Sequence, residues 1–423
     1  MKKRVQILAA ILVMLWAVPV WAAAPTGELY GGLAYEWDRV EEKPVLASIP
    51  LGFRLALEDE LDSLGKLHFS TKGWWDWKLK DGKLELDQLW LKGYYGDFDY
   101  QLGKQLISWG TADGFNPTNY FTRMSSSALL GGDLRGEAVW AGRVEYYARA
   151  WSGTAVVIPV FAPQKIDAFM EKLMLEAGPQ GAQLLEAIEG AKKPGLGHPE
   201  LALRLETQLA GFDLQASYFW GYEPLPGIEL VLGPTVPGGM ALEGTYRRQH
   251  FLGLALAGTL GPAGVWAEAS YGGPEKFAEP ENPYEVRIPM SINERYFQAV
   301  VGGDYTVDVG SGLLVQAQYI YRGQGSLLEP YVQPDLTAFP PAPGEIQGAH
   351  YLYGRLAYDF NPDASADLVI LYGTQEKGGI IRPSYTHRLG EGLQLELSLV
   401  QPFGEGKFDS ISTRAALTVK YQF

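Results

Sequence analysis

The sequence predicts an all-β fold, a transmembrane antiparallel β-barrel of about 18 strands with a short helical segment in one outer loop. Three observations predict this class. Apolar and polar residues alternate with a period of two in many short segments. Short and long connections between these segments alternate along the chain. The last residue is Phe423, whereas most soluble domains end in a short polar tail.

The first 22 residues have the layout of a secretory signal peptide. A basic start, "MKKR", precedes an apolar run from about Val5 to Val20 and a small residue, Ala22. An uncleaved membrane anchor is the alternative, but a spanning helix needs roughly 20 apolar residues. We expect cleavage after Ala22, which leaves one exported domain, 23–423. The formal charge then changes from -14 to -17 because three basic residues are removed.

The composition favours a barrel over the other exported classes. The chain has no cysteine, so a disulfide scaffold, a haem attached through cysteine and a thiolate metal site are excluded. We expect no cofactor and no metal site. Gly 51, Tyr 24 and Trp 12 are high counts, and the mean hydropathy is near zero. Lipid-facing and lumen-facing residues cancel in such an average when they alternate along strands.

The predicted strands alternate cleanly in most places. In the segment 201–209, Leu203 and Leu205 face one way while Arg204 and Glu206 face the other. The phase slips near Gln88, and Lys104 falls on the apolar face of its strand, so we expect a bulge there or a different register. Further alternating segments lie at 29–37, 47–57, 66–78, 313–322, 393–399 and 411–423.

The connections predict which end of the barrel carries the loops. Turn residues mark tight connections near 96, 148, 211, 262, 310, 362 and 391. Longer connections occur at 108–133, 162–199, 223–243, 272–293 and 323–348. This is typical of a spanning barrel with short periplasmic turns and long outer loops. An even strand count returns the C-terminus to the periplasmic side.

The loop 162–199 has apolar residues at helical spacing, which Gly178 and Pro179 should break into two helices. Its helices could form a lid over the pore or an outer cap that packs on neighbouring loops.

The last strand carries a recognisable pattern. Leu417, Val419, Tyr421 and Phe423 lie on one apolar face, with polar residues between them. This pattern resembles the assembly signal of bacterial outer-membrane barrels. The resemblance implies localisation in the outer membrane, with membrane lipid and the barrel-assembly machinery as partners. The alternative is a soluble β-sandwich or propeller with an ordinary last strand.

A second resemblance covers about 25 residues. The segment "GKQLISWG" with a following Asn-Pro is similar to a segment of porin-like barrels of the alginate-export kind and related uncharacterised outer-membrane families. The matching residues are Gly103, Lys104, Gln105, Trp109, Gly110, Asn116 and Pro117. The loop 108–133 is rich in Gly, Ser, Thr and Asn, and an inward fold of it would place Trp109, Gly110, Asn116 and Pro117 at a constriction.

A barrel of this size leaves an aqueous channel unless something fills it. Strand pattern begins at about Leu29, so we expect no separate plug domain, and any plug must come from loops. The inward positions favour basic residues, which would attract anions. The alternative is that these residues pair with lumen acids as structural ladders. The predicted pore-lining residues are Arg54, Lys72, Lys92, Arg143, Arg204, Arg247, Arg355, Arg382, Arg414, Lys420, Glu206 and Glu268.

These features predict a porin that admits small hydrophilic solutes, anionic or polyhydroxylated, by passive diffusion. A plugged or structural barrel and an exporter of an acidic polysaccharide are the alternatives. A transporter of hydrophobic solutes would need an apolar lumen. No His-x-x-Glu-His or Gly-x-Ser-x-Gly stretch is present, so we expect no enzyme. The acidic balance gives no support for nucleic-acid binding. A homotrimer is one assembly to consider.

Overall fold

A computed structural model describes residues 25–38, 41–61, 65–112, 115–121, 136–166, 170–171, 174–175, 178–280, 282–338 and 340–423. The predicted signal peptide, 1–22, lies outside the described residues.

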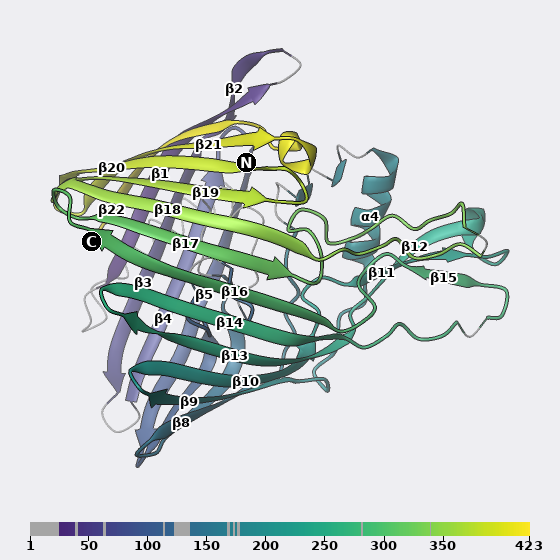
Figure 1. Ribbon diagram of the computed structural model, residues 1–423, viewed down its shortest axis with the longest axis horizontal. Helices are drawn as coiled ribbons and strands as arrows, with labels where there is room; N and C mark the ends of the chain where they lie inside the picture. Colours follow the sequence, from purple (N-terminus) through teal and green to yellow (C-terminus); the bar gives the residue numbers. More distant parts are fainter. Residues whose placement is uncertain are drawn as a thin grey trace.

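One antiparallel sheet closes into a barrel (Figure 1). It contains 19 strand segments, but β2 and β3 are separated only by Ile49 and both pair with β1, so the barrel has 18 strands, as predicted. The strands are β1 (Thr26–Asp38), β2 (Lys43–Ser48), β3 (Pro50–Leu61), β4 (Gly65–Asp76), β5 (Asp81–Tyr95), β6 (Phe98–Gln105), β7 (Val139–Tyr147), β8 (Trp151–Ile158), β9 (Glu200–Leu209), β10 (Phe212–Tyr222), β13 (Arg248–Leu260), β14 (Ala263–Pro274), β16 (Tyr296–Val307), β17 (Leu313–Arg322), β18 (Ala349–Asn361), β19 (Ala364–Gly373), β20 (Gly378–Gly390), β21 (Leu393–Gly404) and β22 (Arg414–Gln422).

The last strand closes the barrel against the first. β22 pairs with β1 from Glu36↔Arg414 to Glu28↔Gln422. Beyond that register, the Gly27 amide donates to the Phe423 carbonyl at 2.9 Å, and the Phe423 amide donates to Gly27 at 3.1 Å. Closure removes the unpaired edges that an open sheet would expose in lipid, where unsatisfied backbone groups cost several kcal/mol each.

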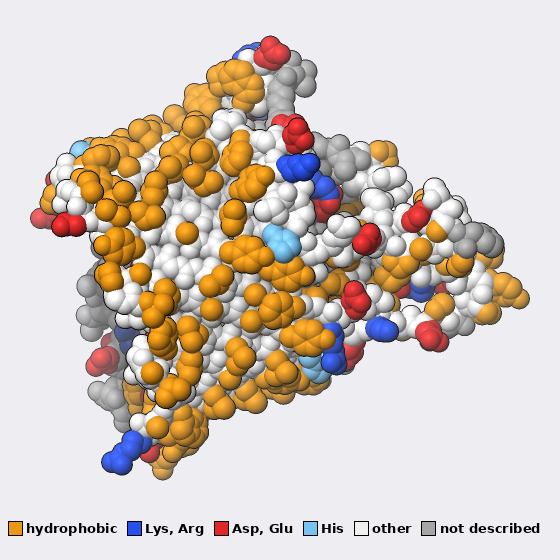
Figure 2. Space-filling view, in the orientation of Figure 1, with side chains coloured by type: hydrophobic (Ala, Val, Ile, Leu, Met, Phe, Trp, Pro, Cys, Tyr) orange, Lys and Arg blue, Asp and Glu red, His pale blue; other side chains and the backbone are white. Residues whose placement is uncertain are grey.

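The two faces of the strands differ in exposure as the period-2 pattern predicts. On β9, the side chains of Leu203 and Leu205 are 55% and 57% exposed. Ala202, which lies between Leu201 and Leu203 and faces the other way, is 1% exposed. The outer surface carries the leucines and aromatics, and Figure 2 shows apolar side chains covering the barrel while charged side chains gather toward its ends. The wall therefore has a surface suited to lipid outside and a polar face inside.

The connections alternate as predicted. Short turns join β5 to β6, β9 to β10, β13 to β14 and β20 to β21 at the end that holds the C-terminus (Figure 1). The long connections lie at the opposite end. They contain α4 (Pro179–Gly190), a three-stranded sheet of β11 (Gly227–Leu232), β12 (Met240–Thr245) and β15 (Val286–Pro289), and the 3₁₀ turns η2 (Pro237–Gly239) and η3 (Gly406–Ser410).

These outer elements share an apolar core of their own. Ile188 of α4, Ile228 and Leu230 of β11 and Ile288 of β15 are 0–5% exposed and belong to one cluster. α4 begins at Pro179 after Gly178 adopts φ 77°, so the predicted helix break is confirmed. Residues 170–171 and 174–175 are also helical, whereas Ile166, also expected in the first helix, is not, and 167–169, 172–173 and 176–177 lie outside the described residues. No helix in the described part of the chain is long and apolar enough to cross a membrane.

Two expectations about register are resolved. The phase slip near Gln88 is a bulge, because the β4–β5 register shifts between Ser70 and Thr71, opposite Leu86–Gln88. The expectation that the last strand begins at 411 is wrong by three residues, since β22 begins at Arg414. Ile411 instead follows η3 and is 2% exposed in the same cluster as Phe408.

Candidate functional site

The connection after β6 turns into the barrel. We call its described residues, 106–112 and 115–121, the inner segment. Ile107, Trp109 and Phe121 are 2–3% exposed. These apolar side chains cover lumen-facing side chains that would otherwise contact water. Their partners from β7 to β13 are Val139, Ala141, Val156, Ile158, Ala202, Phe219 and Phe251. The remainder of this loop through 135 lies outside the described residues.

A tight turn shapes the inner segment. Asn116 donates its side-chain Nδ2 to the Trp109 carbonyl at 2.8 Å, and the Asn119 amide donates to the Asn116 carbonyl at 3.2 Å. Pro117 occupies the second position of this turn, where its fixed φ is favourable. Gly110 has φ 86°, and a Cβ there would lie 2.2 Å from Asn116 Nδ2. Residue types at three motif positions are therefore set by the turn itself.

Glu268 holds the inner segment from the other side of the lumen. Its side chain is on β14 and is 2% exposed. One carboxylate oxygen accepts hydrogen bonds from the Thr111 amide and from the Ala112 amide, the latter at 2.6 Å; the other accepts from Thr118 Oγ1 at 2.7 Å. β7, β8, β9, β10 and β13 lie between β6 and β14 in the sheet. The segment therefore crosses the barrel interior, and Glu268 positions it.

The inner segment also contacts strands beyond β14. Ala112 and Phe115 pack against a buried cluster that includes Ile320 and Tyr351. The Arg322 guanidinium lies 5.5 Å from the centre of the Phe115 ring, within the range of a cation–π contact. Inner-segment contacts thus extend from β7 to β17.

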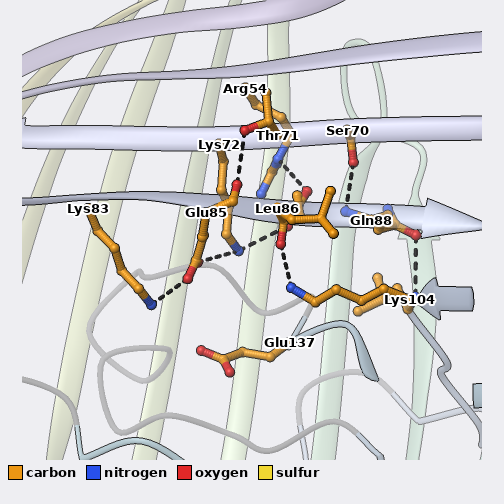
Figure 3. Close-up of polar contacts among 12 residues, drawn as sticks. Arg54, Ser70, Thr71, Lys72, Lys83, Glu85, Leu86, Gln88, Lys104 and Glu137 are labelled. Carbon is orange, nitrogen blue, oxygen red and sulfur yellow. Dashed lines mark hydrogen bonds and ion pairs between the residues drawn. The ribbon is translucent and has the colours of Figure 1, made fainter. Parts of the chain in front are cut away.

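A basic cluster lies on the wall formed by β3 to β6 (Figure 3). Lys72 contacts Asp87 at 3.0 Å and Glu85 at 3.6 Å, and Arg54 contacts Asp87 at 3.1 Å. Lys83 also pairs with Glu85. From the loops, Lys165 pairs with Glu137 at 2.8 Å and approaches Glu85 at 3.9 Å. Four cations therefore pair with three carboxylates, and Lys104 lies beside them with its Nζ on the Leu86 carbonyl, so these eight side chains have a formal charge of +2.

Lys104 joins this cluster because the backbone is irregular on both strands. Gly103 adopts φ 126°, a conformation that side chains disfavour, and a Cβ there would lie 2.2 Å from the Leu89 carbonyl oxygen. Lys104 Nζ donates to the Leu86 carbonyl, beside the β5 bulge (Figure 3). The bulge itself lies in the β4–β5 pairing, whereas Lys104 pairs with Leu89 and Trp140 without a register shift.

Most of the other basic residues predicted to line the pore are paired with acids. Arg204 contacts Glu206 at 2.8 Å, and its guanidinium lies 5.2 Å from the Trp109 ring centre. These pairs match the ladder alternative, and each pair contributes no net charge. The remaining pairs are Lys92–Asp99 at 3.2 Å, Arg143–Glu145 at 3.9 Å, Arg355–Asp367 at 2.6 Å, Arg414–Glu36 at 3.9 Å and Lys420–Glu396 at 2.7 Å.

Three arginines are arranged differently: one pairs with an acid outside the barrel strands, and two have no carboxylate partner among the described residues. Arg247, predicted from the sequence to line the pore, lies just before β13 and is 5% exposed; Glu223 accepts two of its hydrogen bonds at 2.7 Å. Arg382 on β20 and Arg322 on β17 have no carboxylate within pairing distance in the described parts of the chain, and the Nε of each has no hydrogen-bond partner. Arg322 Nη1 donates only to the Gly325 carbonyl, at 3.3 Å.

A cavity of about 310 Å³ lies where the inner segment meets the outer loops, and we call it the mouth cavity. Arg322, Gln298 and Tyr296 line it from the strands. Asn119 and Tyr120 line it from the inner segment. Burial raises the pKa of Glu223, another lining residue, to about 6 in spite of the adjacent Arg247. Within the described ranges no group of three or more His, Asp or Glu could hold a metal ion.

Sequence reasoning missed Lys83, Lys165 and Arg322. Lys83 and Glu85 could have been found from their spacing of two in "KLELD", which puts both on one face. Arg322 ends an alternating segment opposite the apolar face, so the same rule applied to it. Lys165 had no local signal, because a folded loop brings it to the wall.

Comparison with known proteins shows the fold. No protein-family model matches the chain, and no curated protein matches it. Among solved structures, OccAB3 of Acinetobacter baumannii is similar with a TM-score of 0.54 and 10% identity, over 95% of this chain and 99% of that chain. OccK8 (OprE) of Pseudomonas aeruginosa has a TM-score of 0.51 and 11% identity, over 95% and 98%. The outer membrane protein OpdK of the same organism has a TM-score of 0.51 and 11% identity, over 95% and 99%. The chain therefore has the fold of outer-membrane porin barrels.

Proposed function

We propose that the protein is a channel of the bacterial outer membrane through which small hydrophilic anions diffuse passively. The mature domain would be 23–423, exported with the signal peptide 1–22. Organic acids and acidic sugars are the expected solutes. The single observation that carries the proposal is the basic cluster, in which five cations gather around three carboxylates and four of them form ion pairs.

Charge position supports an anion preference better than total charge does. The whole chain is acidic, at -14, and the lumen carboxylates Glu268 and Asp304 have no cation partner among the described residues. Arg322, Arg382 and the surplus of the basic cluster nevertheless place positive charge without a carboxylate partner on the described barrel interior. A surplus of positive charge in a narrow aqueous channel raises the local concentration of anions and excludes cations. The ladders contribute little selectivity because their charges cancel.

The inner segment would form the constriction. It crosses the lumen between β6 and β14 and is held at both ends. Trp109, Gly110, Asn116 and Pro117 would fix its shape, and the solute would pass between it and the basic cluster. The apolar outer face and the aromatic end of β22 suit the outer membrane, where assembly would depend on Leu417, Val419, Tyr421 and Phe423.

A plugged barrel is the second candidate, because the same inner segment fills part of the lumen. Recording of single channels in a planar bilayer under a KCl gradient separates the two. Steady conductance with a reversal potential on the anion side is the expected result. Cation preference would refute the anion proposal, and a folded barrel without conductance would favour the plugged barrel.

A further inference from the structure

An apolar pocket of about 630 Å³ lies among the outer elements, and we call it the outer pocket. α4, β11 and β12 line it, and so do the loops that follow β15 and β17. Its apolar lining includes Met174, Leu184, Leu230, Met240 and Met290. Methionine side chains adapt to ligands of different shape because they are unbranched and polarisable. Gln180, Gln183 and Gln333 add polar groups to the lining, and the methionines and leucines make the pocket suited to a flexible apolar group.

The outer pocket adjoins the mouth cavity. Met170, Pro330 and Tyr331 line both spaces. Consecutive residues of one loop also divide between them, since Leu327 lines the mouth cavity and Leu328 lines the outer pocket. The Tyr331 hydroxyl donates to the Pro226 carbonyl at 2.9 Å, which fixes the shared wall.

The mouth cavity contains a buried cation that can bind the anionic end of a molecule entering from the outer pocket. Arg322 is 8% exposed, lines the cavity and keeps hydrogen-bond donors unused. A buried guanidinium without a carboxylate partner is costly, and a carboxylate can supply two parallel hydrogen bonds to it. Lys407, which also lines the outer pocket, does not compete with Arg322 for the anion, because Lys407 is paired with Glu329.

We propose that the solutes include carboxylates with a short alkyl chain, which enter through the outer pocket and then contact Arg322. This inference rests on the proposed function, since it assigns a solute class to the same channel. The apolar chain would lower the free energy of the solute above the constriction, while the carboxylate stays hydrated until it meets the arginine. Because each buried methylene contributes about 0.8 kcal/mol, affinity should rise about fourfold for each methylene added.

The test is block of the ion current by acetate, butanoate, hexanoate and octanoate at pH 7, added to the outer side alone. The expected result is an apparent blocking constant that tightens steeply with chain length. Ala241→Trp, which fills the pocket, and Met240→Glu, which adds a charge at a residue that is 51% exposed, should abolish the length dependence. Gly195→Trp is the matched control, since nothing lies within 4 Å of a Cβ there.

Arg322→Met should weaken block by carboxylates of every length. Equal blocking constants for acetate and octanoate, or an unchanged length dependence in both pocket variants, would overturn the inference while leaving anion selectivity intact. Cation preference in KCl would instead refute the proposed function. If the barrel does not conduct, saturation-transfer NMR of the same acids on protein in nanodiscs gives the length dependence, with empty nanodiscs as the blank. Binding that is equal in wild type and Met240→Glu would then overturn the inference.

Discussion

The Glu268 carboxylate accepts a hydrogen bond from Thr118 Oγ1 at 2.7 Å across 150 residues of sequence. With the Ala112 amide at 2.6 Å, this contact ties the inner segment to β14 on the far part of the wall. The position of the inner segment therefore depends in part on one buried carboxylate.

Replacing that carboxylate should release the inner segment. Each hydrogen bond to a charged group contributes about 1.5–3 kcal/mol. An amide has no charge, and where its oxygen faces the Thr111 and Ala112 amides its NH2 replaces the oxygen that accepts from Thr118 Oγ1. We expect Glu268→Gln to raise single-channel conductance and open-channel noise. Asp304→Asn is the control, because it removes a lumen carboxylate on β16 that accepts no hydrogen bond from the described inner segment. Equal conductance and noise for Glu268→Gln and wild type would show that other contacts hold the inner segment in place.

Gly110 should not accept a side chain. Its φ of 86° costs a non-glycine residue roughly 1–2 kcal/mol, and the new Cβ would lie 2.2 Å from Asn116. We expect Gly110→Ala to destabilise the inner segment and to increase hydrogen exchange of its amides. Gly190→Ala, where nothing lies within 4 Å, should leave exchange of the inner segment unchanged. Equal hydrogen exchange in Gly110→Ala and wild type would show that Asn116 can move aside for the new methyl group.

The charge of Glu85 should limit anion selectivity. This carboxylate pairs with Lys83 and Lys72 and approaches Lys165, so its removal would leave the cations of the basic cluster less neutralised. Relative to wild type, we expect Glu85→Gln to shift the reversal potential further to the anion side. Lys72→Met should shift the reversal potential toward the cation side. Lys43→Met changes an exposed pair with Glu41 on the outer hairpin and should shift nothing. Shifts of opposite sign would contradict anion passage along this wall.

The outer loops should be more stable at mildly acid pH. Burial raises the pKa of Glu223 to about 6, above its ordinary value of 4.5, so the folded loop binds the proton more tightly than the unfolded loop. Its contribution is therefore fully present below pH 4.5 and is lost as pH rises through 6, by about 2 kcal/mol in all. Hydrogen exchange of the Glu223 amide, which donates to Arg247 at 3.1 Å, should report this after correction for intrinsic rates.

Two variants test whether Glu223 causes this pH dependence. Glu223→Gln should remove the dependence on pH and expose Arg247 as an unpaired buried charge, whereas Glu279→Gln on the exposed surface should preserve the dependence. Protection that increases from pH 4.5 to 6.5 in wild type would contradict the direction of the shift.

Phe423 should matter more for assembly than for the finished barrel. Its backbone pairs with Gly27, and its ring stacks with Tyr421 at 5.9 Å, but the residue is 43% exposed. We expect Phe423→Ala to reduce the heat-modifiable fraction in outer membranes while purified, folded barrels keep their conductance. Exposed Phe360→Ala, a matched aromatic, should not reduce that fraction. Equal insertion of both variants would remove Phe423 from the assembly signal.

The sequence by itself determined the strands, the closure and the end that carries the loops. These follow from local chemistry, since alternation at a spacing of two sets the faces of β9 and β22, and Gly, Pro, Asn and Asp mark the turns. The helix break at Gly178 and Pro179 was also predictable for the same reason.

Only the tertiary structure decided what the lumen contains. Arg204 beside Glu206 could be expected from spacing, but Arg247 with Glu223, Lys165 with Glu137 and Thr118 with Glu268 join separate connections and strands. Sequence alternation gives the side on which a charge lies and not its partner, because the partner depends on the path of loops through three dimensions. The same limit hid the two arginines without acids, since a lack of pairing is a property of the folded barrel.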